Sequence, residues 1–390
     1  MNSPLRKASA VVLAVTITVL ISNRLPADTS TCGGIPVPLP FTDVAGNLFF
    51  CQIAEAFFSG LTNGTTSTTY SPGSSVPREQ MAAFITRTQD SALTRGSRRA
   101  ALNKWATSHP LPFTGRVAVG AAPQLVESDG VDLWVADSTS GDVSRVRASD
   151  GSPQGTWTGA ANAFGVLVTL GRIWVSGGTH LYVIDPAGTP GTVNTAAATF
   201  VEARGIATDG FYIWVADRGA ATMDAVGPNT EQTFFTIGGF VEPEGVVYDG
   251  ANLWVTDQSA NLLRKLGTPR PDIVQNVPVG SHPQFPVFDG ANIWVPNNGS
   301  DSVTVVRVRD GLVLATLTGN GLNGPVQAAF DGQRVLVTNE LGNILSMWNA
   351  SDLTPIGNFA TGPSTLPFGA CSDGINFWVT LVFQGQLARL

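Results

Sequence analysis

The stretch Asp129-Gly130-Val131-Asp132-Leu133-Trp134-Val135 decides the fold, because it recurs along the chain. Four close copies follow it, at Asp209–Val215, Asp249–Val255, Asp289–Val295 and Asp373–Val379. Two degenerate copies complete the series: Leu170–Val175 lacks the Asp-Gly pair, and Asp331–Val337 has leucine where the others have tryptophan. The positions equivalent to the tryptophan are Trp134, Trp174, Trp214, Trp254, Trp294, Leu336 and Trp378. Consecutive positions are 40 residues apart up to Trp294 and 42 apart thereafter.

Repeats of this length predict a mainly β fold, a seven-bladed β-propeller over residues 113–390 in which each repeat supplies four short strands. In the copy around Trp254 the expected strands are 245–248, 253–256, 262–266 and 276–279. The Asp249-Gly250 pair between the first two strands favours a tight hairpin turn. Because the tryptophan recurs within a strand in almost every copy, we interpret it as packing between blades rather than as a ligand platform.

The two ends of the repeat region indicate how the ring closes. The last repeat ends at 386–390, after its third strand. Residues 115–120, just before the first repeat, resemble the fourth-strand segment 277–280. We therefore expect an N-terminal strand to complete the last blade, which removes an exposed sheet edge.

Composition agrees with this architecture and excludes one class of function. The chain has 43 glycines, 25 prolines and only 13 % charged residues, which suits short strands joined by turns. The formal net charge of −7 argues against a nucleic-acid partner. The basic cluster Arg95, Arg98, Arg99 and Lys104 is interpreted as a solvated helix face.

Residues 1–30 are predicted to be a signal peptide or an N-terminal anchor. Arg6 and Lys7 precede the apolar run Ala8–Ser22, which is too short for an ordinary membrane span. Ala27 offers only a weak cleavage site, so cleavage and retention both stay open. The predicted localisation is exported, in the cell envelope, on the cell surface or outside the cell, with membrane contact only through this segment.

The three cysteines fit an oxidising compartment. Cys32 and Cys51 are expected to form a disulfide, worth about 3 kcal/mol by loop closure. Cys371 lies in an apolar strand-like run and is predicted to be a small core residue. No Cys/His cluster has metal-ligand spacing, so no cofactor is predicted from these residue types.

Residues 38–90 form a different unit, with a helix expected over 49–59 and a second starting near Pro77. The segment resembles the surface-layer homology (SLH) domain of bacterial envelope proteins through Phe41, Asp43, Gly60, Gly64, Pro72, Arg78 and Ala82. The resemblance implies a small α-helical domain that binds an envelope polysaccharide through Asp43 and Arg78. Only one copy is present, and an ion pair of Arg78 within the domain is the structural alternative. Residues 91–112 are expected to be a helical connector.

Candidate ligand-contact residues lie in the loops that enter each first strand, ten and twelve positions before the tryptophan position. The third to fifth repeats carry polar side chains there: Glu202, Arg204, Glu242, Glu244, His282 and Gln284. The second, sixth and seventh carry apolar ones: Phe164, Val326, Leu366 and Phe368. We expect these loops to surround one mouth of the central channel, half charged and half apolar, which suits an unknown protein, peptide or glycan.

Residues 113–390 resemble the NHL-repeat and streptogramin-lyase-like propellers, a match that identifies fold better than function. The resemblance to the lyases implies a histidine, carboxylates and a magnesium ion on an equivalent face. His282 could serve as a general acid or base, and Glu202, Glu242 and His282 could hold a divalent metal such as Mg²⁺. The alternatives are an ordinary surface histidine and a simple ion pair between Arg204 and Glu244.

Three functions remain open from the sequence. The leading hypothesis is an exported envelope protein, attached by its SLH-like module, whose propeller is a non-enzymatic binding scaffold. The alternative is an exported lyase or hydrolase with a metal-assisted His/Glu site at the mouth. The third is a purely structural interaction module.

Overall fold

The computed structural model describes residues 28–32, 35–58, 62, 64–78, 80–81, 115–267 and 272–390. The chain forms two compact units: Met1–Cys51 with Asn63–Ser74, and Gln52–Thr62 with Ser75–Leu390. The predicted signal segment up to Ala27, the connector at 91–112 and the basic cluster lie outside the described residues. In the part of the chain that is described, no helix is long and apolar enough to cross a membrane.

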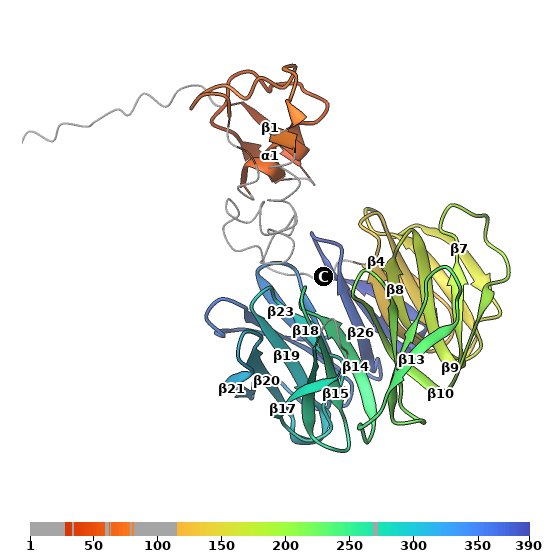
Figure 1. Cartoon of the computed structure of the whole chain (residues 1–390). Helices are drawn as coiled ribbons and strands as arrows, with labels where there is room; N and C mark the ends of the chain where they lie inside the picture. The colour runs from red at the N-terminus through yellow and green to blue at the C-terminus, as the bar shows by residue number, and fades with distance from the viewer. Residues whose placement is uncertain are drawn as a thin grey trace, which may run out of the picture. The chain divides into compact units, whose positions relative to one another are not determined.

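The repeat region folds into a β-propeller, as predicted (Figure 1). The first repeat forms a four-stranded sheet of β4 (Pro123–Ser128), β5 (Asp132–Asp137), β6 (Asp142–Arg147) and β7 (Pro153–Thr158). The fourth forms β14 (Pro243–Tyr248), β15 (Leu253–Asp257), β16 (Leu262–Leu266) and β17 (Ile273–Pro278). The fifth forms β18 (Val287–Phe288), β19 (Asn292–Asn297), β20 (Ser302–Arg307) and β21 (Leu312–Thr318), with a short 3-10 turn η1 (Asn298–Ser300). The sixth forms β22 (Pro325–Phe330), β23 (Arg334–Asn339), β24 (Ile344–Asn349) and β25 (Pro355–Ala360).

The prediction of a seven-bladed propeller is wrong, because the described propeller has six blades, each a single hydrogen-bonded sheet. The second and third repeats share one six-stranded sheet of β8 (Ala163–Thr169), β9 (Arg172–Ile184), β10 (Asn194–Thr208), β11 (Ile213–Asp217), β12 (Thr222–Val226) and β13 (Thr233–Ile237). β9 and β10 stay extended where other repeats have loops. Gly177 and Gly178 replace the Asp217-Arg218 pair of the third repeat, and a Cβ at Gly177 would lie 2.8 Å from the Ala161 carbonyl oxygen. The two repeats are joined by the pairing of β9 with β10, in which Gly178 lies opposite Ala203. The seven sequence repeats are therefore distributed over six hydrogen-bonded sheets.

Ring closure follows the prediction. The last sheet contains β26 (Pro367–Ser372), β27 (Phe377–Leu381), β28 (Gln386–Arg389) and β3 (Gly115–Ala118), with η2 (Val382–Gln384) between β27 and β28. The N-terminal strand β3 pairs antiparallel with the C-terminal strand β28, with Val117 opposite Leu387. A second contact closes the ring: the Thr380 hydroxyl of the last repeat donates a hydrogen bond to the Gln124 carbonyl of the first repeat, at 2.7 Å.

The recurring Asp-Gly-Trp pattern has one local explanation. In the fourth repeat, Asp249 Oδ1 accepts from the Ala251 and Asn252 amides, and its Oδ2 accepts from Trp254 Nε1 at 2.7 Å. Gly250 has φ +92°, a conformation that L side chains rarely adopt, which explains the glycine. One carboxylate therefore closes the hairpin and satisfies the buried indole.

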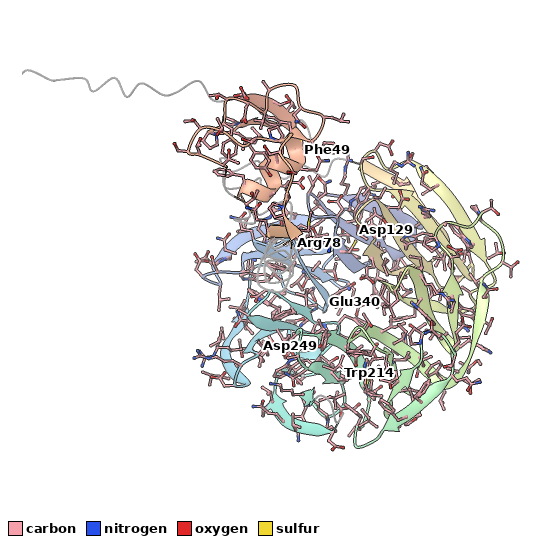
Figure 2. The ribbon with its side chains drawn as sticks, turned by 45° about the horizontal axis from the view of Figure 1, so that its top comes forward. Phe49, Arg78, Asp129, Trp214, Asp249 and Glu340 are labelled. Atoms are coloured by element: carbon pink, nitrogen blue, oxygen red, sulfur yellow. A yellow bond between two sulfur atoms is a disulfide. The ribbon has the colours of Figure 1, made fainter. Side chains whose placement is uncertain are left out.

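The tryptophans pack between repeats, as expected. Trp134 is fully buried and contacts Val166, Ile173 and Val175 of the second repeat. Trp378 closes the series against Leu133 and Val135 of the first repeat. Trp214 is labelled inside the propeller in Figure 2. By analogy with other large-to-small core changes, truncating one of these indoles to alanine costs about 3–5 kcal/mol.

The N-terminal unit contains a hairpin that the sequence did not predict, β1 (Thr29–Cys32) with β2 (Ile35–Pro38). The expected first helix is α1 (Phe50–Phe58). Cys32 and Cys51 form a disulfide with a Cα–Cα distance of 5.5 Å. Gly60 and Ala82, two positions of the SLH-like pattern, lie outside the described residues, whereas Arg78, Gln80 and Met81 are helical.

Candidate functional site at the propeller mouth

A repeated backbone hydrogen bond builds one end of the channel, which we call the mouth. In each repeat that has this bond, the donor is the backbone amide of the residue four positions after the tryptophan position. The acceptor is the carbonyl of the residue twelve positions before that same tryptophan position. Examples are Arg218 to Glu202 (2.9 Å), Gln258 to Glu242 (2.8 Å) and Asn298 to His282 (3.0 Å). The bond also occurs in the first, sixth and seventh repeats. It places two rings of side chains at the same end of the channel.

Aspartates at the ends of second strands fix the glutamate-bearing loops. Asp217 accepts from the Val201 and Glu202 amides, both at 2.8 Å. Asp257 accepts from the Glu242 amide, also at 2.8 Å. The backbone that carries the mouth glutamates is therefore held from the neighbouring strand end.

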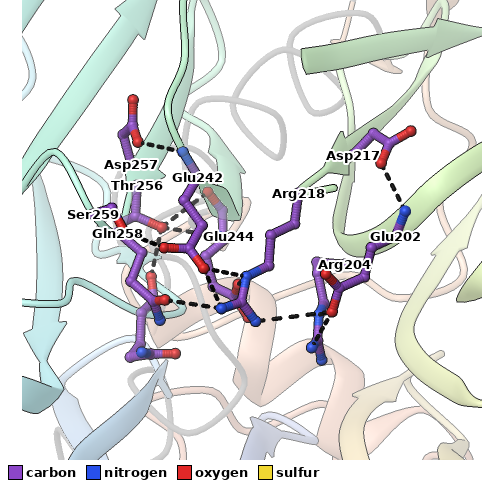
Figure 3. A network of polar contacts seen from close by, with 12 residues as sticks. Glu202, Arg204, Asp217, Arg218, Glu242, Glu244, Thr256, Asp257, Gln258 and Ser259 are labelled. Carbon is purple, nitrogen blue, oxygen red and sulfur yellow. Dashed lines mark hydrogen bonds and ion pairs between the residues drawn. The ribbon is translucent and has the colours of Figure 1, made fainter. Parts of the chain in front are cut away.

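Arg218 is the centre of the mouth network (Figure 3). Its guanidinium pairs with Glu242 through Nε at 2.7 Å and through Nη2, and its Nη1 lies 3.8 Å from Glu202 Oε1. Its Nε lies 3.5 Å from Glu244 Oε2. Burial would lower the pKa of Arg218, but these carboxylates outweigh it and raise the pKa above its usual value. The arginine therefore stays charged.

Arg204 joins this network to the aromatic side chains. Its Nε and Nη2 bind Glu202 Oε1 at 3.0 and 2.5 Å. Its guanidinium carbon lies 4.4 Å from the centre of the Phe164 ring, a cation–π contact. The pair that the sequence offered as an alternative, Arg204 with Glu244, is thus replaced by a direct pair of Arg204 with Glu202.

The two inner glutamates differ in protonation. Burial raises the pKa of Glu244 to about 7, against the lowering effect of Arg204 and Arg218. Its Oε2 makes no hydrogen bond within the described residues, because the 3.5 Å approach to Arg218 is a charge contact only. Burial would also raise the pKa of Glu242, but hydrogen bonds from Ser259 and Arg218 outweigh it and lower the pKa. The mouth therefore holds Glu242, which stays ionised at neutral pH, beside Glu244, which titrates near neutral pH.

His282 lies in the neighbouring loop without joining the hydrogen-bond network. Its amide donates to Asn261 Oδ1 at 2.9 Å, and its backbone has φ +51°. The imidazole is exposed and makes no hydrogen bond to any described residue, although its charge helps to lower the pKa of Glu242. Across the described ranges, no three His, Cys, Asp or Glu side chains are arranged to hold a metal ion. Glu202 and Glu242 face arginines rather than His282. Gln284 donates its amide to the Pro296 carbonyl at 2.8 Å.

The apolar half of the predicted mouth lies inside the channel. Phe164, Leu125, Phe285 and Val326 are buried together with the half-buried Phe368 packed against them, a cluster that we call the aromatic plug. The ring centres of Phe164 and Phe368 are 5.9 Å apart, and those of Phe164 and Phe285 are 5.6 Å apart. The expected apolar ligand surface is therefore a packed core, with Arg204 stacked on it.

Asp43 has a structural role in the N-terminal unit. Its two carboxylate oxygens accept from the Tyr70 and Ser71 amides, at 2.8 and 2.7 Å. These bonds, with Tyr70 foremost, lower the pKa of Asp43. Arg78 is exposed (Figure 2).

Sequence reasoning missed Arg218. It stands four residues after Trp214, and the equivalent positions are Ser138, Gly178, Gln258, Asn298, Glu340 and Val382. Aligning the repeats on both sides of the tryptophan would have placed Arg218 opposite Glu202, because strand ends and strand starts meet at one mouth.

Comparisons with known proteins agree on the fold. No protein-family model matches the chain, and no curated protein matches it. Among solved structures, a streptogramin B lyase has a TM-score of 0.57 at 15 % identity, covering 69 % of this chain and 93 % of that one. A catalytically inactive virginiamycin B lyase from Staphylococcus aureus with quinupristin has a TM-score of 0.61 at 14 % identity, covering 70 % and 97 %. A selenomethionine-substituted form from the same organism has a TM-score of 0.60 at 15 % identity, with the same coverage. At these identities the likeness shows a shared fold, and the repeat region is a β-propeller similar to those of the streptogramin B lyases.

Proposed function

We propose that this chain is an exported cell-envelope protein whose propeller binds a ligand at the mouth without transforming it. The observation that carries the proposal is the pair of arginines held among carboxylates. The side chains of Arg204 and Arg218 are 23 % and 26 % exposed, and that of Glu202 is 39 % exposed. A fixed group of donors and acceptors that still reaches solvent suits a polar ligand.

The charges at the mouth indicate the chemistry of that ligand. A guanidinium pairs best with a carboxylate, and Glu202 and Glu242 accept hydrogen bonds from amino or hydroxyl groups. A peptide or glycan that bears both acidic and amino groups matches this mixture. Because the framework bonds to Asp217 and Asp257 hold the loops, little ordering is needed on binding.

Envelope attachment is proposed to act through Arg78. Asp43 has both oxygens engaged with the Tyr70–Ser71 backbone, which leaves the exposed Arg78 as the side chain suited to a carboxylate-bearing polymer. The resemblance to a single SLH domain supports this assignment.

Co-sedimentation with isolated cell envelopes tests attachment. We expect the wild-type protein to sediment with envelopes and Arg78→Ala to remain in the supernatant. Arg309→Ala is the matched control, since the Arg309 side chain is 72 % exposed on the propeller. Equal sedimentation of Arg78→Ala and wild type contradicts attachment through Arg78.

Screening peptides and glycans against the immobilised protein tests the mouth. We expect binding by the wild type and by Arg309→Ala, and at least tenfold weaker binding by Arg204→Ala. A ligand that Arg204→Ala binds as tightly as wild type would place the binding face elsewhere on the propeller.

A second candidate is an exported lyase or hydrolase, favoured by Glu244. A carboxyl group with a pKa of about 7 is suited to donate or accept a proton near neutral pH. The fold is shared with structures whose names say lyase. In this hypothesis His282, Glu242 and Glu202 act with a divalent metal such as Mg²⁺ once substrate draws them together.

Turnover assays decide the second candidate. Cyclic peptides, lactones and glycans are incubated with the protein, with Mg²⁺ or with EDTA. We expect metal-dependent turnover that His282→Ala and Glu244→Gln both abolish without lowering the unfolding temperature. Absence of turnover across these classes contradicts the enzymatic function and leaves the binding function standing.

A further inference from the structure

A cavity of about 410 Å³ occupies the channel beyond the aromatic plug, away from the mouth. Its wall includes Leu125 and Phe285 of the plug and extends to Ser128, Tyr248 and Ser372, which precede the hairpin turns at the opposite end. None of the mouth residues Glu202, Arg204, Glu242 or Glu244 lines it. The cavity is therefore separate from the site proposed above, and its volume falls in the range of small-molecule sites.

The wall combines aliphatic side chains with a comparable amount of polar surface, and its polar side chains mostly have partners. Gln327 Oε1 accepts from the Ala370 amide at 2.7 Å. Ser128 and Ser372 accept from the Gly130 and Gly374 amides at 3.1 and 3.0 Å. The Thr208 hydroxyl donates to the Tyr212 carbonyl at 2.9 Å. These side chains therefore form hydrogen bonds to the backbone of the strands and turns, and these bonds stabilise the fold.

Glu127 is different. One carboxylate oxygen, Oε2, accepts from the Val168 amide of the next repeat at 3.1 Å. The other makes no hydrogen bond within the described ranges, and no lysine, arginine or histidine lines the cavity. A half-buried acidic side chain thus lines the channel, with one carboxylate oxygen available to the cavity and no cation in the lining.

We propose that this cavity binds a small molecule with an apolar body and a single ammonium group, which pairs with Glu127. The aliphatic wall contributes by burying the body of the ligand. The ammonium supplies both the charge and the hydrogen-bond donor that the carboxyl group lacks. A neutral ligand of the same shape gains the burial of its apolar body but not the pairing with Glu127.

Binding of such a ligand is linked to pH. Burial raises the pKa of Glu127 to about 8, so the empty site is mostly protonated at pH 7. Cys371 and Tyr248 are the other titratable groups of the wall, and burial raises both of their pKa values. Asp373, which contributes to the shift of Cys371, is engaged with the Trp378 indole. Of these groups of the wall, Glu127 is the one that titrates between pH 6 and 8. An ammonium ligand therefore binds up to about tenfold more tightly for each pH unit, and its affinity levels off above pH 8.

Isothermal titration calorimetry of the full chain with 2-phenylethylamine tests the proposal, with 2-phenylethanol as the neutral probe. We expect the amine to bind at least tenfold more tightly than the alcohol at pH 8. We also expect close to one proton released per amine at pH 7, measured in two buffers of different ionisation enthalpy. Equal affinities, or no amine binding at millimolar concentration, overturn the proposal.

Two variants assign the site. Glu127→Gln keeps an acceptor for the Val168 amide but cannot carry the charge, and we expect it to lose the preference for the amine and the proton release. Val287→Phe fills the cavity while leaving Glu127 in place, and we expect it to lose both probes, which decides the matter if Glu127→Gln does not fold. Glu231→Gln, in a surface ion pair with Arg172, is the control and should behave as wild type. Amine binding unchanged in Glu127→Gln or Val287→Phe overturns the assignment, whatever the mouth binds.

Discussion

Glu244 at the mouth and Glu127 in the channel are both enclosed carboxyl groups on first strands of the propeller, yet their surroundings differ. Glu244 has Arg204 and Arg218 beside it and a pKa of about 7. Glu127 has only the Val168 amide and a pKa of about 8. Glu244 lies ten positions before its tryptophan and Glu127 seven, so three residues along a strand separate a mouth rich in arginines and glutamates from a channel whose lining holds no cation. The position of a carboxyl group along the first strand therefore determines whether arginines lie beside it, and with them its pKa.

Glu127→Gln should give the largest effect. The folded pKa lies above the ordinary value of 4.5, so the stabilisation by the bound proton is complete below pH 4.5 and is lost as pH rises to about 8. Glu127→Gln has no ionisable group at this position, so its stability does not fall in this way as the pH rises. We expect its free energy of unfolding, relative to wild type, to rise by about 4 kcal/mol between pH 4 and pH 9. Urea denaturation at both pH values measures the difference, and parallel pH profiles would show that Glu127 is ionised in the folded state.

Glu244→Gln should give a smaller change in a lower pH window. The same sign applies, because burial raises the pKa of Glu244 as well, but the stability is lost between pH 4.5 and about 7. We expect a relative gain of about 3 kcal/mol over that window. A transition that extends to pH 8 or beyond would mean that the arginines do not reach Glu244, and the contrast with Glu127 would disappear.

Arg218→Met should make the surroundings of Glu244 at the mouth more like those of Glu127 in the channel, which has no cation nearby. Glu244 loses a neighbouring cation, so its pKa should rise toward that of Glu127, and Glu242 loses its bidentate partner. Because Arg218 is partly exposed, we expect a loss of only about 2 kcal/mol at pH 8 and less at pH 5, where Glu244 is protonated in either protein. Chemical denaturation at the two pH values measures this. Arg309→Met, at an exposed ion pair, serves as the control and should change stability by less than about 0.5 kcal/mol.

Arg204→Lys should have the smallest effect. The lysine keeps the charge beside Glu202 but loses the planar stacking on Phe164 and the two-nitrogen contact. We expect a loss of about 1 kcal/mol in the free energy of unfolding and no change in the pH window of Glu244. A shifted window would show that the guanidinium, rather than its charge alone, controls Glu244.

The repeat was sufficient to predict a β-propeller, although not its number of blades, because each copy carries its own physical explanation. Asp249, Gly250 and Trp254 form one hydrogen-bonded hairpin, and the spacing of such hairpins predicts blades. The closing strand was also predictable, since the last repeat lacked a fourth strand and a matching segment preceded the first. The union of two repeats in one sheet was not, because it depends on the pairing of β9 with β10, which the repeat pattern does not indicate.

The site was predicted less completely. The loops before the first strands of the third to fifth repeats were predicted to carry polar side chains to one mouth, and Glu202, Arg204, Glu242 and Glu244 do lie together. Arg218 was missed because it belongs to the other side of the tryptophan in sequence. Phe164 and Phe368 were assigned to a ligand surface, although in a narrow channel large rings bury one another. Glu127 gives no sequence signal, since its isolation depends on what surrounds it.

The pairing of β3 with β28 also sets the order of events when the molecule is made. Arg116 on β3 binds Gln384 across 268 positions of sequence, so the first strand of the ring is synthesised long before its partner. Until β28 has been synthesised, β3 has no neighbour and the ring has an open edge. Because the entropy of closing a loop grows only with the logarithm of its length, the last step adds little cost in spite of the distance. Completion of the propeller thus waits for β28, and a chain without β28 would be left with two unpaired strand edges, those of β27 and β3.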